Sequence, residues 1–452
     1  MIILSKFKPY TYYMLSKKYK GLYLVPVFIL PAFAFVIALS GYINNTSKPV
    51  TTEKCFILSD IHFDPLWGAH RDTALYQKLV NLPVEQWKAL FETQKKQTTV
   101  NSDLLGKDAN YGVLKSALAN MKSKLADPAF IVIAGDFIWH GAKPKDSILK
   151  RKVMFFIAGL FKENFPNTTI IPALGNNDTY GNDYELQEPK YLKDFADAWS
   201  PNLPKSAADE IKANNFYSIR KGNIKFLVVN SASLAYGSQY QEQADTQLAW
   251  LQANLSNADN KNIWIISHIP PGLNGYNNKN MWNVDNTQTF VNSLVKYADK
   301  VKFEIASHTH FNDFKIYYDA AKKPVAFMRI VPSICSNHGN NPSFEIADFN
   351  SNEGSIINET NYYLHLDAIP KDQDGAGAPW ENTISLYASF NISNYKPQSI
   401  SKIIDNIRTD KSGLEVHNYV KFYTVDTPTD SSKTINRANY LNYLKADSLK
   451  AN

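Results

Sequence analysis

The sequence predicts an α/β fold in which helices pack against β-sheets. Two observations support this class. Apolar runs of five to seven residues, typical of buried strands, alternate with stretches whose apolar residues recur at helical spacing. Five of these runs stop at Asp, His or Asn, which is typical of strands that deliver polar side chains to one sheet edge. The chain has 452 residues, 44% of them hydrophobic, and can bury a large core.

Each expected helix precedes one of the apolar runs, as in units of strand, helix and strand. The first run is CFILS, at the start of the main domain. The helices and the runs that come after them are 111–125 before FIVIA, 153–165 before TTIIPAL, 244–255 before NIWII, and 290–297 before VKFEIAS. We therefore expect these strands to lie in sheets that are covered by the helices.

The region after residue 310 is expected to form a second sheet. Its runs FKIYY, PVAFMRIVPSI, SFEIADF and NYYLHLDAI are separated by Gly, Asn and Lys turns, which favours a meander of neighbouring strands. A loop at 370–380 marks an expected boundary. Residues 370–452 are predicted to form a mainly helical subdomain, with helices over 397–407 and 436–449.

The N-terminal residues are expected to precede the folded domain. Residues 1–20 are basic, residues 21–41 carry no charge, and residues 42–53 form a polar linker before the main domain at 54–369. About twenty apolar residues can cross a membrane, and basic residues before them place the rest of the chain on the far side. The segment is predicted to be a transmembrane anchor or a cleaved signal peptide. The main domain would then be membrane-anchored on the non-cytoplasmic side, or secreted.

Composition excludes some classes of function. Charged residues make up 20% of the chain and the net charge is +6, with much of the excess ahead of the apolar segment. No basic stripe is interleaved with aromatic residues, so no nucleic-acid partner is expected. The two cysteines, Cys55 and Cys335, are either separate buried thiols or one disulfide of an exported protein.

The polar clusters at the ends of the runs carry the chemistry. In chain order they are Asp60-Ile61-His62, Gly135-Asp136, Gly175-Asn176-Asn177-Asp178, Ser267-His268 and His308-Thr309-His310, and they contain four of the nine histidines. Residues two apart on an extended strand share a face, so each D-x-H or H-x-H pair can bind a cation. Each cluster alone could be an ordinary turn. Together, in this order, they predict a two-metal hydrolytic centre.

This order of clusters resembles the calcineurin-like metallophosphoesterase superfamily, and within it the acid sphingomyelinase-like phosphodiesterases most. The motifs that carry the resemblance are DIHFDPLW, NYGVLKSAL, GDFIWHG, SHIPPG and SHTHFNDF. The similar region runs from about Cys55 to Thr424. Endopolyphosphatases are similar too.

The resemblance implies a four-layer α/β/β/α sandwich with a small C-terminal helical subdomain, and hydrolysis of phosphoric esters, diesters before monoesters. A hydroxide that bridges two metals would attack phosphorus. Zinc is the first expectation for the metals, with manganese and iron as alternatives. The substrate would be a lipid head group, a nucleotide or polyphosphate. The implied ligands are Asp60, His62, Asp136 and His310 for the first metal, and Asp136 again with Asn176, His268 and His308 for the second.

The sequence departs from the family at one catalytic position. Many relatives carry His where this chain has Asn177, and that His is assigned to stabilising charge or protonating the leaving group. His140, four residues after Asp136, is the best substitute. Asn177 and His140 are therefore the candidate catalytic residues beside the ligands. The long insert at 63–110 is expected to cover the site and to shape specificity.

Two rival functions stay open at this stage. One is an endopolyphosphatase or nucleotide phosphohydrolase. A long chain of phosphates would need a basic groove, which five residues after Asp136 could supply: Lys143, Lys145, Lys150, Arg151 and Lys152. A non-catalytic metal-binding surface protein is the other rival, and the missing His is its only support.

Overall fold

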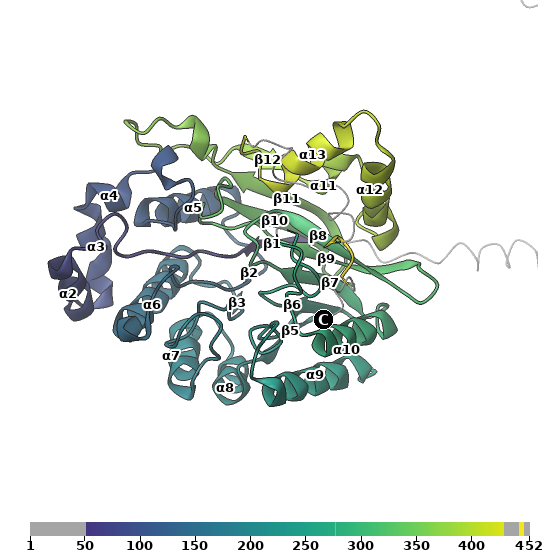
Figure 1. The fold of residues 1–452 in the computed structure, drawn as a ribbon. Helices are drawn as coiled ribbons and strands as arrows, with labels where there is room; N and C mark the ends of the chain where they lie inside the picture. The colour runs from purple at the N-terminus through teal and green to yellow at the C-terminus, as the bar shows by residue number, and fades with distance from the viewer. Residues whose placement is uncertain (1–50, 276, 429–442, 447–452) are drawn as a thin grey trace, which may run out of the picture. The chain divides into compact units, whose positions relative to one another are not determined.

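The computed structural model describes residues 51–428 except residue 276, together with residues 443–446. Its strands form two six-stranded mixed sheets (Figure 1). The first sheet has the order β12 (Asn382–Ile384), β11 (Ile356–Tyr363), β10 (Ser343–Asn350), β1 (Thr52–Leu58), β2 (Ile131–Ile133), β3 (Ile170–Pro172). The second has the order β4 (Tyr217–Lys221), β5 (Ile224–Val228), β6 (Ile263–Ile266), β7 (Val301–Ala306), β9 (Pro324–Ile330), β8 (Asp313–Tyr318). The expected α/β class is confirmed.

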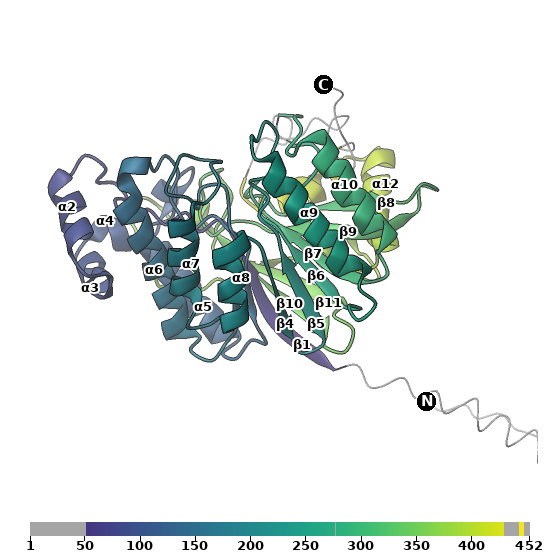
Figure 2. The same cartoon turned by 90° about the horizontal axis from the view of Figure 1, so that it is seen from below.

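Helices cover the outer faces of the sheets (Figure 2). The described α-helices are α2 (Thr73–Asn81), α3 (Trp87–Glu92), α4 (Lys95–Thr98), α5 (Tyr111–Lys124), α6 (Ser147–Asn164), α7 (Pro189–Trp199), α8 (Lys205–Asn214), α9 (Gln241–Ser256), α10 (Val284–Lys296), α11 (Leu386–Phe390), α12 (Pro397–Thr409) and α13 (Leu414–Tyr423). Helices α5, α6 and α7 lie beside the first sheet, and α9, α10 and α12 beside the second (Figure 2).

The helices begin where their sequences favour a start. Asn110 caps α5, because its side-chain oxygen accepts a hydrogen bond from the Val113 amide. Helix α12 begins with Pro397, whose missing amide hydrogen is not needed in the first turn. The predictions for 111–125 and 397–407 are confirmed to within two residues at each end.

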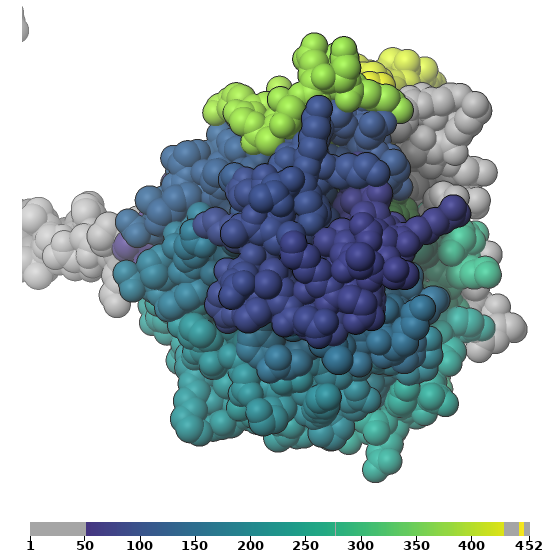
Figure 3. All heavy atoms as spheres, turned by 90° about the vertical axis from the view of Figure 1, so that its left-hand side faces the viewer, coloured from purple at the N-terminus to yellow at the C-terminus, as the bar shows by residue number. Residues whose placement is uncertain are grey.

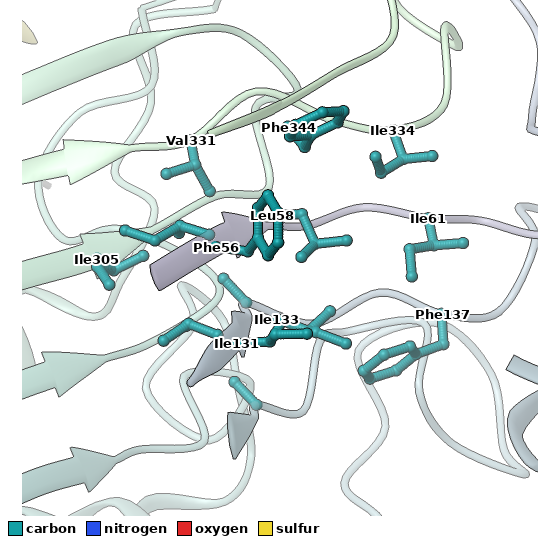
Figure 4. Close-up of a cluster of buried hydrophobic side chains, with 14 of the residues drawn as sticks. Phe56, Leu58, Ile61, Ile131, Ile133, Phe137, Ile305, Val331, Ile334 and Phe344 are labelled. Atoms are coloured by element: carbon teal, nitrogen blue, oxygen red, sulfur yellow. The ribbon is translucent and has the colours of Figure 1, made fainter. Parts of the chain in front are cut away.

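The core lies between the two sheets (Figure 4). Phe56 and Leu58 of β1 and Ile131 of β2 are buried together with Ile305 of β7, which belongs to the second sheet. Burying one such side chain contributes about 1.5–3 kcal/mol. Because β1 and β2 are covered on both faces, their sequences are apolar runs without alternation.

The expected second-sheet meander after residue 310 is wrong. Strands β8 and β9 join the second sheet, but β10 pairs with β1 in the first sheet, and β11 pairs with β10. All four runs are apolar enough to fit either sheet, so their sequences do not specify the partner. The hairpin of β4 and β5 and helices α7 and α8 were not predicted at all.

Some of the predictions concern the ends of the chain. The predicted apolar segment at 21–41 and most of the helix predicted at 436–449 lie outside the described residues. No helix within the described residues is long and apolar enough to cross a membrane. Residues 370–428 contain α11, α12 and α13 and also supply β12 to the first sheet, and the subdomain with its boundary at residue 370 stays a prediction.

The insert at 63–110 forms helices α2, α3 and α4, which pack outside α5 and α6. Its purple and blue atoms fill the centre of one face of the molecule (Figure 3). None of these three helices lines the pocket that contains the predicted ligands. The insert reaches that site at its end, through Asp108, which bonds His140.

Candidate metal centre

All predicted ligands come after the carboxyl ends of strands that run parallel to at least one neighbour. Asp60 and His62 follow β1, Asp136 follows β2, and Asn176 follows β3 in the first sheet. In the second sheet, the loops after β6 and β7 carry the remaining histidines, His268, His308 and His310. Because parallel strands end at the same edge, loops from both sheets meet there.

The ligands do not lie on extended strands, as the D-x-H and H-x-H spacing had suggested. β1 ends at Leu58 and β7 at Ala306. Five ligands have left-handed backbone conformations instead: Asp60 (φ 46°), His62 (39°), Asp136 (59°), His308 (72°) and His310 (65°). Each costs about 1 kcal/mol or more in a residue other than glycine, and such strain accumulates at functional sites.

Gly175 is required for the close approach of two of these loops. A Cβ atom added there would lie 2.0 Å from Asp136 Oδ1 and 2.5 Å from the Asp136 amide nitrogen. The glycine before Asn176 therefore lets the loop after β3 pack directly against Asp136.

Asp60 is the centre of three imidazoles. Its Oδ1 atom lies 3.7 Å from His62 Nε2, 3.5 Å from His310 Nε2 and 3.9 Å from His268 Nε2. These distances are too long for hydrogen bonds. Within the described residues, Asp60 Oδ1 and His62 Nε2 are buried without a hydrogen-bond partner. A cation among these atoms would satisfy them, so the donor set fits a metal ion.

Asp136 connects this group with the second set of ligands. Its Oδ2 atom lies 3.3 Å from His62 Nε2 and 3.1 Å from His268 Nε2. Asn176 Oδ1 lies 3.0 Å from His268 Nε2. Asp136, His268 and His308 form one group of closely spaced donor atoms, and Asp60, His62 and Asp136 form another. The geometry therefore fits two cations that share Asp136.

Backbone carbonyls hold two of the imidazoles in one tautomer. His62 Nδ1 donates to the carbonyl of Ile138 (2.7 Å), and His268 Nδ1 donates to the carbonyl of Ala134 (2.8 Å). A carbonyl only accepts, so Nδ1 carries a hydrogen, and Nε2 is the nitrogen whose lone pair a bound cation would take. His310 Nδ1 lies 3.4 Å from Cys335 Sγ.

The buried carboxylates of Asp60 and Asp136 make the metal centre favour positively charged groups. Burial lowers the pKa of His62, but Asp136 and Asp60 raise it more, to about 10. Burial likewise lowers the pKa of His268, and Asp136 raises it to about 9. Burial raises the pKa of Asp136, but His268 and His62 lower it well below its usual range. Burial and His268 lower the pKa of His308 to about 3, so this ring is neutral.

Sequence reasoning gave Asp178 no role, although it lies in the Gly175–Asp178 cluster. Its carboxylate accepts hydrogen bonds from the amides of Asp136 (2.8 Å), Phe137 (2.8 Å) and Gly175 (2.9 Å). It therefore ties the loop after β2 to the loop after β3. The signal that could have identified it is its position at the end of that cluster.

His140, the predicted substitute acid, lies at the centre. Its ring stacks on His62 with centroids 3.8 Å apart. Its Nδ1 atom lies 2.6 Å from Asp108 Oδ1, and its amide donates to Asp108 Oδ2. Asp108 was missed, because the segment GKDAN carries no pattern that marks it.

Asn177 contacts a ligand. Its amide donates to Asp136 Oδ1 (2.8 Å) and its side-chain Nδ2 donates to Asp136 Oδ2 (2.9 Å). Asn177 therefore fixes the shared carboxylate with two hydrogen bonds. It also lines the pocket beside the ligands.

Two neighbouring cavities open at the centre. A metal pocket of about 180 Å³ includes Asp136, His140, Asn176, Asn177, His308 and His310 in its lining. An outer pocket of about 420 Å³ adjoins it. Both are lined by Asp183, Tyr184, Asn274 and His308. Together they could take a phosphate group and a larger substituent.

The two cysteines are free and buried at separate places. Cys55 Sγ lies 3.8 Å from the carbonyl of Ala347, whereas Cys335 contacts His310. Of the two alternatives, separate buried thiols are therefore confirmed, and a disulfide between the two cysteines is not formed.

These ligands and this fold define a metal-dependent hydrolase of phosphoric esters. A model of the calcineurin-like phosphoesterase family matches residues 54–312, more than half of the chain. The protein belongs to the calcineurin-like phosphoesterase family.

Relatives of known name are similar to most of the chain. It is 25% identical to sphingomyelin phosphodiesterase 2 of Caenorhabditis elegans over 70% of this chain, and it spans 53% of that protein. It is 23% identical to sphingomyelinase phosphodiesterase C of Dictyostelium discoideum, over 86% of this chain and 91% of the relative. It is also 23% identical to the human cyclic GMP-AMP phosphodiesterase SMPDL3A, over 72% of this chain and 76% of that one.

Proposed function

We propose that this enzyme is a two-metal phosphodiesterase that acts outside the cytoplasm. One observation carries the proposal. The Asp60 and Asp136 carboxylates lie among imidazole nitrogens of His62, His268 and His310, at 3.1–3.9 Å, beside an open pocket. When two divalent cations are bound in such a centre, they neutralise phosphoryl oxygens and supply an activated water molecule.

The chain's own residues would hold the ligands and move the proton. Asn177 keeps both oxygens of Asp136 in place. Asp108 holds His140 at Nδ1, which leaves Nε2 free to give a proton to the leaving oxygen in the metal pocket. His140 therefore takes the role of the family histidine that Asn177 replaces.

A diester is a better substrate for this site than polyphosphate. Polyphosphate would need a groove lined by basic side chains. Three of the basic residues after Asp136 instead bond other parts of the protein. Lys150 donates to the carbonyls of Thr179 and Gly181 and is buried. Lys152 donates to carbonyls at the end of α2, and Arg151 pairs with Asp194. These three cations stabilise loops and helices, which leaves only the exposed Lys143 and Lys145 for such a groove.

The names of the relatives suggest two diester classes, choline phospholipids and cyclic dinucleotides. The outer pocket supports an ester whose second substituent is large, because it adjoins the metal pocket and is more than twice its volume. We propose that this substituent lies in the outer pocket during cleavage.

The experiment is to purify the full chain, measure its metal content, and offer it a panel of esters. The panel holds bis(p-nitrophenyl) phosphate, p-nitrophenyl phosphate, sphingomyelin, a cyclic dinucleotide, ATP and polyphosphate. We expect two cations per chain and faster cleavage of a diester than of the monoester. A metal-loaded chain that binds these esters and cleaves none would contradict the proposal and favour a non-catalytic metal-binding protein.

The location outside the cytoplasm rests on the apolar segment 21–41 with its basic lead. A C-terminal epitope tag tests it in intact cells. We expect an added protease to remove the tag without permeabilising the membrane, unless the chain is released into the medium. A tag that is protected in intact cells and retained by them would show that the domain faces the cytoplasm.

A further inference from the structure

His308 differs from the other imidazoles of the centre in which of its two ring nitrogens is contacted by a neighbouring residue. His62, His268 and His310 are each contacted at Nδ1, by Ile138, Ala134 and Cys335, and each presents Nε2 to a carboxylate. In His308 it is Nε2 that has the partner, because the Tyr184 hydroxyl lies 3.1 Å from it. A nitrogen bound to a phenol cannot bind a metal at the same time.

The backbone of Tyr184 is tied to the metal site, although the residue is 42% exposed. Its backbone has a left-handed conformation with φ of 65°, and its amide donates to the carbonyl of Asn176, another predicted ligand. Its ring meets the His308 ring edge-on at 6.0 Å. The backbone of His308 is fixed as well, since its amide lies 3.3 Å from Asp60 Oδ2.

We propose that Tyr184 is a positioning residue that selects Nδ1 of His308 as the metal-binding nitrogen. When His308 Nε2–H donates to the Tyr184 oxygen, Nδ1 keeps the lone pair and is the nitrogen left to bind a cation together with Asp136 and His268. These three residues already offer donor atoms within 4.8 Å of one another. The inference rests on the proposed two-metal centre and adds a determinant that the ligand motifs do not contain.

Tyr184 also lies between the two cavities, because its side chain lines both the metal pocket and the outer pocket. A substituent that enters the outer pocket therefore meets the residue that orients His308. The hydroxyl affects the metal through His308, whereas the ring forms part of the lining of both pockets. A variant that removes only the hydroxyl can separate these two functions.

The test compares Tyr184→Phe with Tyr76→Phe in the full-length protein. Tyr184→Phe removes the hydroxyl and keeps the ring. Tyr76→Phe is a matched control, because its hydroxyl bonds Asp146 and lines neither pocket. Zinc affinity is measured against a competing chelator, the absorption spectrum is recorded after cobalt substitution, and kcat and KM are measured with a small diester.

We expect Tyr184→Phe to weaken the binding of one of the two cations about 10-fold, as loss of a partner to a ligand imidazole does. The cobalt spectrum should change, and kcat should fall while KM stays within about 2-fold. Tyr76→Phe should match the wild type. Unchanged or tighter binding of both cations in Tyr184→Phe would overturn the proposal, because Nε2 would then be the metal-binding nitrogen.

The same data separate this inference from the proposed function. A wild-type chain that binds two cations but cleaves no ester contradicts the enzyme and leaves the affinity comparison as a full test of Tyr184. A wild-type chain that binds fewer than two cations overturns both.

Discussion

The two halves of the candidate metal centre are supported in different ways. In the buried half, which consists of Asp60, His62 and His310, the side chains are almost fully enclosed. The groups that hold its imidazoles are the carbonyl of Ile138 and the thiol of Cys335, and both residues are buried. The fold itself fixes this half.

In the open half, which consists of Asn176 and His308, both side chains border the metal pocket, as His310 of the buried half also does, but their support is different. Their supporting groups are side chains of two adjacent residues in one loop. Asp183 Oδ1 accepts from Asn176 Nδ2 at 2.7 Å, and Tyr184 contacts His308. Substitutions in this loop can therefore change one metal position without disturbing the core, whereas the buried half cannot change alone.

The largest effect is expected where the halves meet. Asp136→Ala removes the carboxylate that both halves share, so we expect loss of one bound cation and a fall in kcat/KM of at least about 10³-fold. Metal analysis and diester hydrolysis measure the two effects. Asp209→Ala, on the exposed surface of α8, is the matched control. Full metal content with normal turnover in Asp136→Ala would show that the two halves do not share this residue.

Without metal ions, the stability of the protein should depend on pH through the histidines that lie beside the carboxylates. Without cations, the pKa of His62 is raised to about 10 and that of His268 to about 9, from 6.5 in the unfolded chain. A raised pKa adds stability that is complete below pH 6.5 and is lost as pH rises toward 9 or 10, on the order of several kcal/mol. The melting temperature of the chelated protein should therefore fall over this range. The zinc-loaded protein, scanned at the same pH values, is the control, and parallel curves would contradict the prediction.

The ligands of both halves could be predicted from the sequence, but the residues that support them could not. Apolar runs mark buried strands, and Asp60, His62 and His310 come directly after such runs. Their left-handed backbones could not be predicted, because a spacing of two residues also fits an extended strand. Asp183 and Tyr184 follow no strand and match no motif, and only the folded chain brings them to Asn176 and His308.

The fold shows the same limit. The strands that precede the ligands were predicted, since each is buried on both faces and ends in a polar cluster. The partners of β10 were not, because strand pairing depends on packing between distant segments. The contact of Asp108 with His140 was missed for the same reason, since the two residues are 32 positions apart.

Substitutions of the supporting residues test whether zinc binding in the two halves tolerates the loss of a supporting contact equally well. Asp183→Ala leaves the Asn176 amide free to rotate, and we expect one cation to bind about 10-fold more weakly. Asp183→Asn keeps an acceptor oxygen and should restore most of the affinity. Chelator competition with zinc measures each variant, and equal affinity of Asp183→Ala and the wild type would contradict the prediction.

In the buried half, Cys335→Ala is the corresponding change. Its thiol contacts His310 Nδ1, but the ring stays enclosed by His62 and His338, with ring centroids 5.0 and 4.5 Å away. We therefore expect a smaller loss of zinc affinity than for Asp183→Ala, and a loss of stability of about 1 kcal/mol from the contact. A larger loss of affinity than in Asp183→Ala would reverse the comparison.

The smallest effect is expected at the serines that precede two of the histidines. Ser307 donates to the carbonyl of Ala134 at 2.8 Å and lies 2.9 Å from His268 Nδ1. Ser307→Ala should cost about 1 kcal/mol of stability, and kcat/KM should change by less than about 3-fold, because Ala134 still holds His268. Ser267 Oγ has no hydrogen-bond partner within the described residues, so Ser267→Ala should be neutral. Chemical denaturation of both variants decides the point: a larger loss in Ser267→Ala would show that the hydroxyl of Ser267, and not that of Ser307, supports the loop of His268.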